Sequence, residues 1–156
     1  MTKTLPVKRA DALRPLSHDH HHGLLLSWKI RTGFRKGIDP ARIKKYADWV
    51  FAGQLQPHFE IEEEYVFPIL GEHNELTKRA LAEHRKIRRL FQATTDMEKN
   101  LVLIEEKLEG HIRFEERVLF NEVQQVASPA ELERIAAVHT PTASLQEGEW
   151  EDEFWK

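Results

Sequence analysis

Apolar residues recur at steps of three and four along most of the chain, and no segment shows the alternation typical of a half-buried strand. This pattern predicts helices over residues 17–36, 40–70, 75–93 and 96–124, and a short fifth helix over 129–138. The expected loops are only a few residues long, so consecutive helices should be antiparallel neighbours. We therefore predict an all-α fold, an up-down-up-down four-helix bundle over about residues 16–124 with a short extra C-terminal helix.

Residues that cap helices mark several of these boundaries. Asp39 precedes a proline, which suits the first turn of the second helix, and Asn74 can cap the third. Two further segments have the spacing of a capping box, in which Ser or Thr is followed three residues later by Glu: Thr95–Glu98 and Ser128–Glu131. The capping residues thus predict the same helices as the apolar pattern.

One segment occurs twice, as HFEIEEEYVF from His58 and as HIRFEERVLF from His111. Each copy has histidine at its start, glutamates four and five residues later, and phenylalanine at its end. The copies fall on the second and fourth predicted helices, which lie diagonally across a bundle of this topology. The repeat therefore implies an approximate two-fold axis along the core.

Helical geometry, at about 100° per residue, indicates which members of the repeat face inward. Glu62 and Glu115 lie on the apolar stripes of their helices, each one turn after a histidine of the repeat. Their neighbours Glu63 and Glu116 fall toward the flank. Each copy thus presents one histidine and one glutamate to the core.

The first and third helices add two more histidines. His84 shares the apolar face of the third helix, and His20 shares that of the first, whereas His21 is about a quarter-turn away. His20 is favoured, although a modest rotation of the helix would exchange it for His21. A rise of about 1.5 Å per residue places all the inward groups within roughly 5 Å along the axis. Six polar side chains are therefore predicted to converge in one layer: His20, His58, Glu62, His84, His111 and Glu115.

Metal binding is the best explanation for this layer. A single buried histidine is more often a hydrogen-bonded structural residue than a ligand. An ionised carboxylate in an apolar core, however, costs several kcal/mol unless it is compensated, and no Lys or Arg shares the stripes at that level. Divalent cations would satisfy all six groups together, and imidazole with carboxylate suits iron, manganese or zinc better than copper(I). Without metal, repulsion and burial should raise the pKa of at least one of the two glutamates.

Some neighbouring residues are expected to be bystanders. Replacement of Glu63, His73 or His139 should leave metal binding intact, because these residues lie off the inner face or away from the middle of the bundle. Tyr65, one turn after Glu62, could donate a hydrogen bond to the site, but its favoured role is that of a packed core aromatic.

Composition and charge narrow the possibilities further. The 156 residues fit a single domain over 1–156, and the lack of cysteine excludes disulfides and thiolate metal sites. The net charge of −3, with both signs mixed, gives no nucleic-acid surface. No run is apolar enough for a membrane span or a secretion signal, so a cytoplasmic protein is expected. The acidic and aromatic tail, residues 140–156, either docks a tryptophan or is frayed.

Taken together, these motifs resemble the hemerythrin family, in particular its HHE cation-binding branch. The resemblance rests on DHHHGL from Asp19, HxxxEE followed by FP from His58, EH at Glu83–His84 and HxxxEE from His111. It implies a four-helix bundle that holds two iron ions, with zinc or manganese as alternatives. It also implies terminal ligands at His20, His58, His84 and His111 and bridging ligands at Glu62 and Glu115.

Two positions differ from the oxygen-carrying hemerythrins. Arg88 stands where they have a second histidine on the third helix, and Glu115 replaces an aspartate that they have one residue later. Fewer histidines leave more open coordination positions, which favours a protein that binds or senses a small diatomic ligand, oxygen or nitric oxide. The alternatives are a di-iron oxidoreductase acting on oxygen, peroxide or nitric oxide, and an iron storage or donation protein. No protein partner is indicated.

Overall fold

The computed structural model describes residues 8–138 and 150–156 and has no strand in that part of the chain, which confirms the all-α class. The helices are α1 (Arg14–Arg35), α2 (Pro40–Val50), α3 (Gln56–Ile61), α4 (Phe67–Leu70), α5 (Glu75–Gln92), α6 (Met97–Phe114), α7 (Phe120–Val126) and α8 (Pro129–Val138). A 3-10 turn, η1 (Asp11–Leu13), precedes α1, which begins earlier than predicted because Pro15 occupies its first turn.

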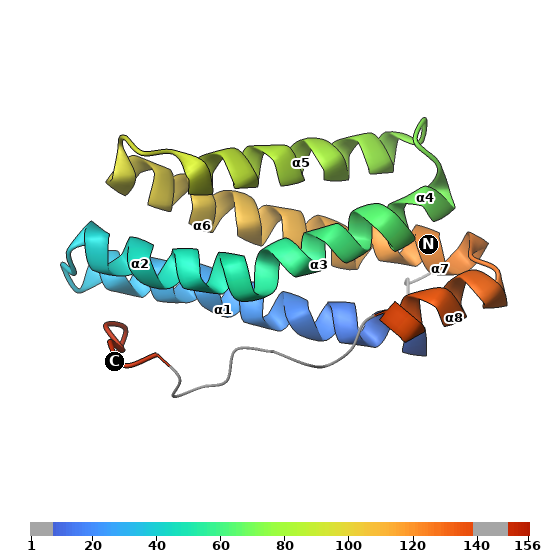
Figure 1. Ribbon diagram of the computed structural model, residues 1–156, viewed down its shortest axis with the longest axis horizontal. Coiled ribbons are helices and arrows are strands. Elements are labelled where there is room, and N and C mark those ends of the chain that lie inside the picture. The colour runs from blue at the N-terminus through green and yellow to red at the C-terminus, as the bar shows by residue number, and fades with distance from the viewer. Residues whose placement is uncertain (1–7, 139–149) are drawn as a thin grey trace, which may run out of the picture.

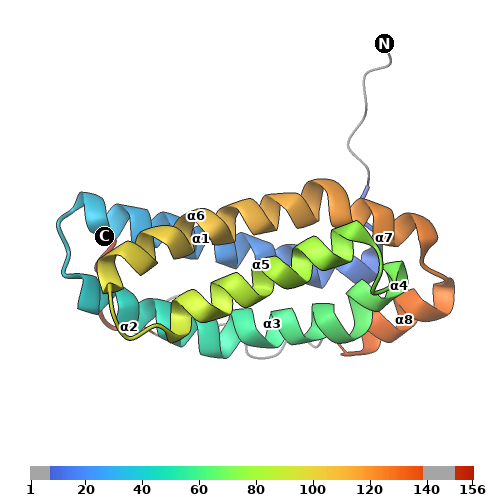
Figure 2. The ribbon, with the colours of Figure 1, turned by 90° about the horizontal axis from the view of Figure 1, so that it is seen from above.

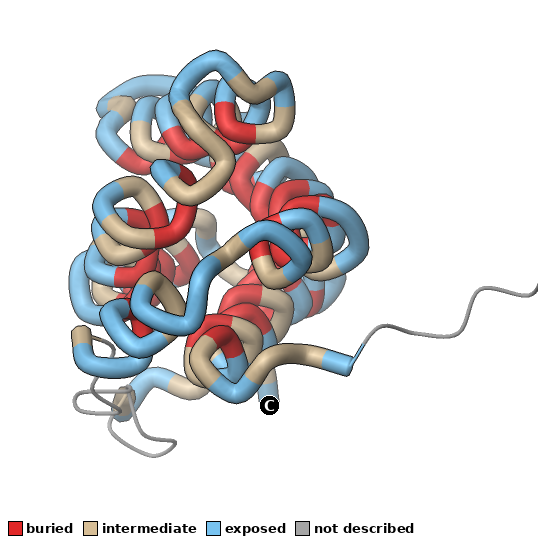
Figure 3. Tube along the Cα trace, turned by 90° about the vertical axis from the view of Figure 1, so that its right-hand side faces the viewer, coloured by how far each residue is buried: buried red, intermediate tan, exposed pale blue. Residues whose placement is uncertain are grey.

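Four long helical stretches form the body of the molecule (Figures 1 and 2). They are α1, the continuous stretch from α2 to α4, α5, and the continuous stretch from α6 to α7. In Figure 1 each stretch runs in the direction opposite to the one before it. The short α8 packs at the end where α4 and α7 finish, against η1. Buried residues line the inner faces of these helices, as seen along the long axis in Figure 3.

Most of the predicted caps are present. The side chain of Asp39 accepts a hydrogen bond from the Ala41 amide, and that of Asn74 accepts one from the Leu76 amide. The Ser128–Glu131 capping box forms both of its reciprocal bonds. The prediction of a capping box at Thr95–Glu98 was wrong.

Asp96 explains the failure of that box. Its φ of 54° puts it in the left-handed region, so that α6 begins only at Met97, too late for Thr95 to be its cap. The Thr95 carbonyl instead accepts a hydrogen bond from the Asn100 side chain.

Three π-helical segments widen the long stretches: η2 (Phe51–Leu55), η3 (Glu62–Val66) and η4 (Glu115–Leu119). Pro57 and Pro68 follow the first two closely, and a proline cannot donate to the carbonyl four residues before it, which favours such widening. η3 and η4 begin at the glutamates that occupy equivalent places in the sequence repeat, so the repeat extends to the backbone. Segments of this kind occur frequently at functional sites.

Two apolar clusters fill the core, one toward each end of the molecule. The cluster near the α1–α2 turn includes a residue from the end of the chain, Phe154, which is 4% exposed and packs against Gly33. Trp150 and Trp155 pack beside it, and Trp155 also covers the Lys29 amine, which lies 3.8 Å from its ring centre. Within 150–156 the tail is therefore docked; residues 139–149 lie outside the described part.

None of the helices in the described ranges is long and apolar enough to cross a membrane.

Candidate metal centre

The six predicted residues meet between the two apolar clusters, each from a different helical element. Every one is at most 4% exposed, and three are completely buried. They are His20 on α1, His58 on α3, Glu62 at the start of η3, His84 on α5, His111 on α6 and Glu115 at the start of η4. His21, by contrast, is exposed on the outer face of α1. The predicted face of the first helix therefore presents His20 to the core.

These residues form two overlapping groups that share both glutamates. One group is His20, His58, Glu62 and Glu115, and the other is Glu62, His84, His111 and Glu115. Within each group, one nitrogen or oxygen from every residue lies within 4.8 Å of the others. The arrangement thus offers two adjoining four-residue sites with two carboxylates in common.

Glu62 is placed between the two groups. Its Oε2 is 3.2 Å from Nε2 of His58, and its Oε1 is 3.2 Å from Nε2 of His84. Glu115 has a similar position, since its Oε1 is 2.9 Å from Nε2 of His20 and 3.3 Å from Nε2 of His111. Each carboxylate therefore faces two histidines, one from each group.

The histidine rings point the same nitrogen at the centre. Nε2 of His58 is 3.2 Å from Nε2 of His20, and Nε2 of His84 is 3.0 Å from Nε2 of His111. In neutral rings whose Nδ1 carries the proton, these contacts bring lone pairs together. Such pairs repel each other unless a proton or a cation lies among them. The inward nitrogens are thus arranged as cation ligands.

A carboxylate outside the centre approaches the other ring nitrogen of every histidine. Three of these contacts are hydrogen bonds that hold the proton on Nδ1 and leave Nε2 free to coordinate, as is usual for histidine ligands of metals. The contacts to Nδ1 are Asp19 to His58 at 3.0 Å, Glu63 to His84 at 2.6 Å, Glu83 to His111 at 2.7 Å and Glu116 to His20 at 3.5 Å.

Each outer carboxylate contacts the histidine of a neighbouring helical stretch, and together they close a cycle around the bundle. Glu63 therefore supports His84, and we revise the expectation that its replacement would leave metal binding intact. The supporting roles of Asp19 and Glu83 were missed. The sequence signal is that all four carboxylates directly adjoin a predicted ligand: before it on the first and third helices, and after it on the second and fourth.

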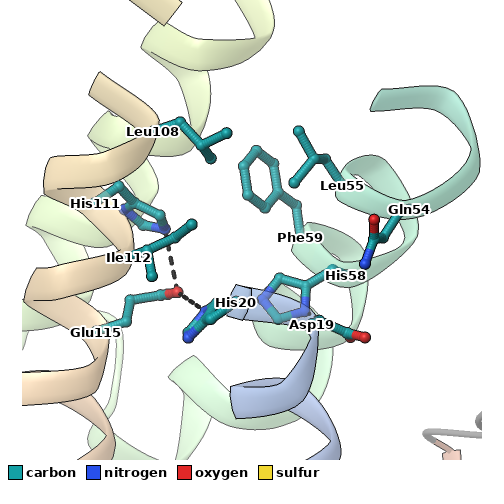
Figure 4. Close-up of a pocket in the computed structure, with 10 residues that line it drawn as sticks. All are labelled: Asp19, His20, Gln54, Leu55, His58, Phe59, Leu108, His111, Ile112 and Glu115. Carbon is teal, nitrogen blue, oxygen red and sulfur yellow. Dashed lines mark hydrogen bonds and ion pairs between the residues drawn. The ribbon is translucent and has the colours of Figure 1, made fainter. Parts of the chain in front are cut away.

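Aromatic rings fix the imidazoles from the sides. Phe59 stacks on His84 with ring centres 3.8 Å apart, and Phe120 stacks on His20 at 5.2 Å. Beside the centre lies a cavity of about 10 Å³, shown in Figure 4, whose apolar walls come from Leu55, Phe59, Leu108 and Ile112. A space of this size accommodates about one water-sized molecule.

Without metal, protons bind to the centre. Burial disfavours the charged ring, but the charge of Glu62 and the bond to Asp19 outweigh it and raise the pKa of His58 to about 9. Burial is likewise outweighed by Glu115 and Glu83, which raise the pKa of His111 to about 10. The pKa of His20 is also raised despite burial, through Glu115 and other carboxylates.

The expected rise of a glutamate pKa is wrong for Glu62. Burial alone would raise it, but the charge of His58 and the close approach of the His20, His58 and His84 rings hold the pKa of Glu62 well below its usual value. The expectation considered repulsion between the carboxylates and their burial, but not the charge of the neighbouring imidazoles. In the structure the imidazoles are closer, and they neutralise this buried charge.

The donor set fits a pair of divalent metal ions. Neither carboxylate oxygen of Glu62, nor Oε2 of Glu115, has a hydrogen-bond donor, although both side chains are completely buried. Buried polar atoms are normally satisfied, so these orphaned oxygens call for a cation. Four imidazole nitrogens with two carboxylates are suitable ligands for iron, manganese or zinc.

The remaining candidates lie apart from the centre. His73 is exposed beside Glu72, and His139 lies outside the described residues. Tyr65 packs, partly buried, against the apolar cluster near α8. Arg88 donates a 2.6 Å hydrogen bond to Glu63 and so extends the support of His84.

Comparison with protein families matches residues 11–122 to the hemerythrin HHE cation binding domain. Searches of curated proteins and of solved structures found no match.

Proposed function

The chain belongs to the family of hemerythrin HHE cation-binding domains, and from this premise we propose that it holds a pair of iron ions within a hemerythrin-like four-helix bundle. In this proposal His20 and His58 are ligands of one ion, and His84 and His111 are ligands of the other. Glu62 and Glu115 bridge the two. The observation that carries the proposal is the pair of four-residue groups that share both glutamates.

We further propose that the centre binds or senses oxygen or nitric oxide. When bound, ferrous ions supply electrons and open coordination positions to such a ligand. The protein's own part is to hold the imidazoles through the outer carboxylates, to surround the centre with apolar side chains and to limit what can enter. The cavity of about 10 Å³ supports a diatomic ligand and leaves no room for an organic substrate.

A second candidate is a di-iron oxidoreductase acting on oxygen, peroxide or nitric oxide. It is favoured by a groove of about 570 Å³ between α5 and α6, which reaches His111 and Glu83. Arg79, Lys86 and Lys107 line this groove, so small polar reactants could collect at the edge of the centre.

Elemental analysis and optical spectra of protein purified without air test both proposals. We expect about two iron ions per chain, as in other binuclear sites, and loss of both in Glu62→Ala. Glu64→Ala is the matched control, because this neighbouring carboxylate is exposed. A spectrum that changes in air and returns under argon would support reversible binding, whereas rapid irreversible oxidation would support the oxidoreductase. Protein that never holds more than one metal ion, even after reconstitution, would refute the paired site.

A further inference from the structure

Gln54 is a buried polar side chain that the metal centre does not explain. It is 8% exposed, and its Nε2 has no hydrogen-bond partner. Gln56, two residues later, shows the ordinary alternative: its amide donates to Glu60 and accepts from Arg88. An unbonded buried amide destabilises a fold, so its retention needs a reason.

The position of Gln54 supplies that reason. It lines the same small cavity as His20, His58, His111 and Glu115, and Figure 4 shows its side chain beside His58. It lies one helical turn before His58 and belongs to the π-helical segment η2. The rest of the wall consists of apolar side chains, residues of the centre and Asp19, which contacts the centre.

The other polar residues of the cavity wall belong to the centre or contact it. Asp19 bonds Nδ1 of His58, and Glu115 lies against His20 and His111. Two nitrogens of the cavity-lining residues have no hydrogen-bond partner: Nδ1 of His20, which faces Glu116 at 3.5 Å, and the amide nitrogen of Gln54, which has no such carboxylate beside it.

We propose that Gln54 is the hydrogen-bond donor to the small ligand that occupies this cavity. This inference rests on the proposed function and makes it more specific. The amide would favour ligands whose outer atom carries negative charge, such as anions or partly reduced diatomic molecules, over neutral and weakly accepting ones. Its role is selectivity among ligands and not metal binding.

The test compares Gln54→Leu with Thr77→Val in the iron-loaded, oxidised protein, with azide as the probe. Thr77 is the matched control because its buried hydroxyl also has no partner, but it does not line the cavity. Loss of a hydrogen bond to a charged ligand should weaken azide binding about tenfold or more in Gln54→Leu, measured by optical titration. Thr77→Val should bind azide as the wild type does. Both variants should keep their iron, and both metal-free proteins should melt at or above the wild-type temperature.

Unchanged azide affinity in Gln54→Leu, beside wild-type protein that binds azide, would overturn this inference alone. Iron loss in Gln54→Leu but not in Thr77→Val would also overturn it, because Gln54 would then serve the metal. Wild-type protein that takes up no iron pair would refute the proposed function, and the role of Gln54 with it.

Discussion

Loading metal into the centre should expel protons from the histidines. In the metal-free protein His58 and His111 have pKa values of about 9 and about 10, so both rings are charged at pH 7. A histidine binds metal only as the neutral ring, so each of these protons must leave. The raised pKa of His20 adds to the same effect.

The size of the effect follows from these values. At least two protons should be released per chain at pH 7, and release should fade as the pH rises past about 9 and 10. Each displaced proton makes the apparent affinity rise about tenfold per pH unit, so two give about 100-fold per unit between pH 7 and 9.

The stability of the metal-free protein should fall as the pH rises, whereas its affinity for metal should increase. A histidine whose folded pKa is raised stabilises the fold fully below its unfolded value of about 6.5 and loses that effect as the pH rises through the folded value. The metal-free protein should therefore melt at lower temperature as the pH increases from 6.5 through 9 and 10.

Zinc is the suitable probe, because it has no redox chemistry. Zinc is added to chelator-treated protein in weak buffer, the released protons are counted by back-titration, and thermal unfolding is followed across the same pH range. Glu83→Gln is the control: without this carboxylate the pKa of His111 should fall, and release at pH 8 to 9 should diminish. Release of fewer than one proton per chain at pH 7, or an affinity for zinc that does not depend on pH, would show that imidazolium rings do not hold the empty centre together.

Three further predictions concern single residues. His20→Ala should lose most of its metal and His21→Ala should not; equal losses in elemental analysis would contradict the face assignment. Asp19→Asn should weaken metal binding about 10- to 100-fold in a chelator competition, because the bond to His58 loses its charge, while His73→Ala should match the wild type. Phe154→Ala should lower the free energy of unfolding in urea by about 3 kcal/mol without changing metal content, and a smaller effect than about 1 kcal/mol would mean that the tail is not part of the core in solution.

Local and periodic information in the sequence predicted most of the fold. Helix stripes and caps depend on residues a few positions apart, so the boundaries near Asp39, Asn74 and Ser128 were predictable. The six-residue layer was predictable for the same reason, because the helix rise and the loop lengths set the depth of each side chain. The structure brings those six residues together, and their role as ligands stays a prediction.

Features that depend on contacts between helices were not predictable from the apolar faces of single helices. Whether Glu63 meets solvent or His84 depends on the rotamer and on the distance to the next helix. The protonation of the centre depends on how closely imidazoles approach Glu62, and the docking of Phe154 depends on space beside Gly33. The predicted cap at Thr95 is absent because Asp96 adopts a left-handed backbone conformation, which the spacing of Thr95 and Glu98 does not indicate.

The cycle of outer carboxylates also affects the handedness with which the helices are arranged. Leucine-rich stripes pack almost equally well whether the helices follow one another clockwise or anticlockwise, so apolar burial specifies handedness weakly. A carboxylate beside a ligand lies on one flank of its helix only, and Asp19, Glu63, Glu83 and Glu116 all lie on the flank toward the histidine that they contact. In the mirror arrangement each would face the wrong neighbour, and four contacts would be lost at once. The residues that orient the histidines therefore also select one handedness of the bundle over the other.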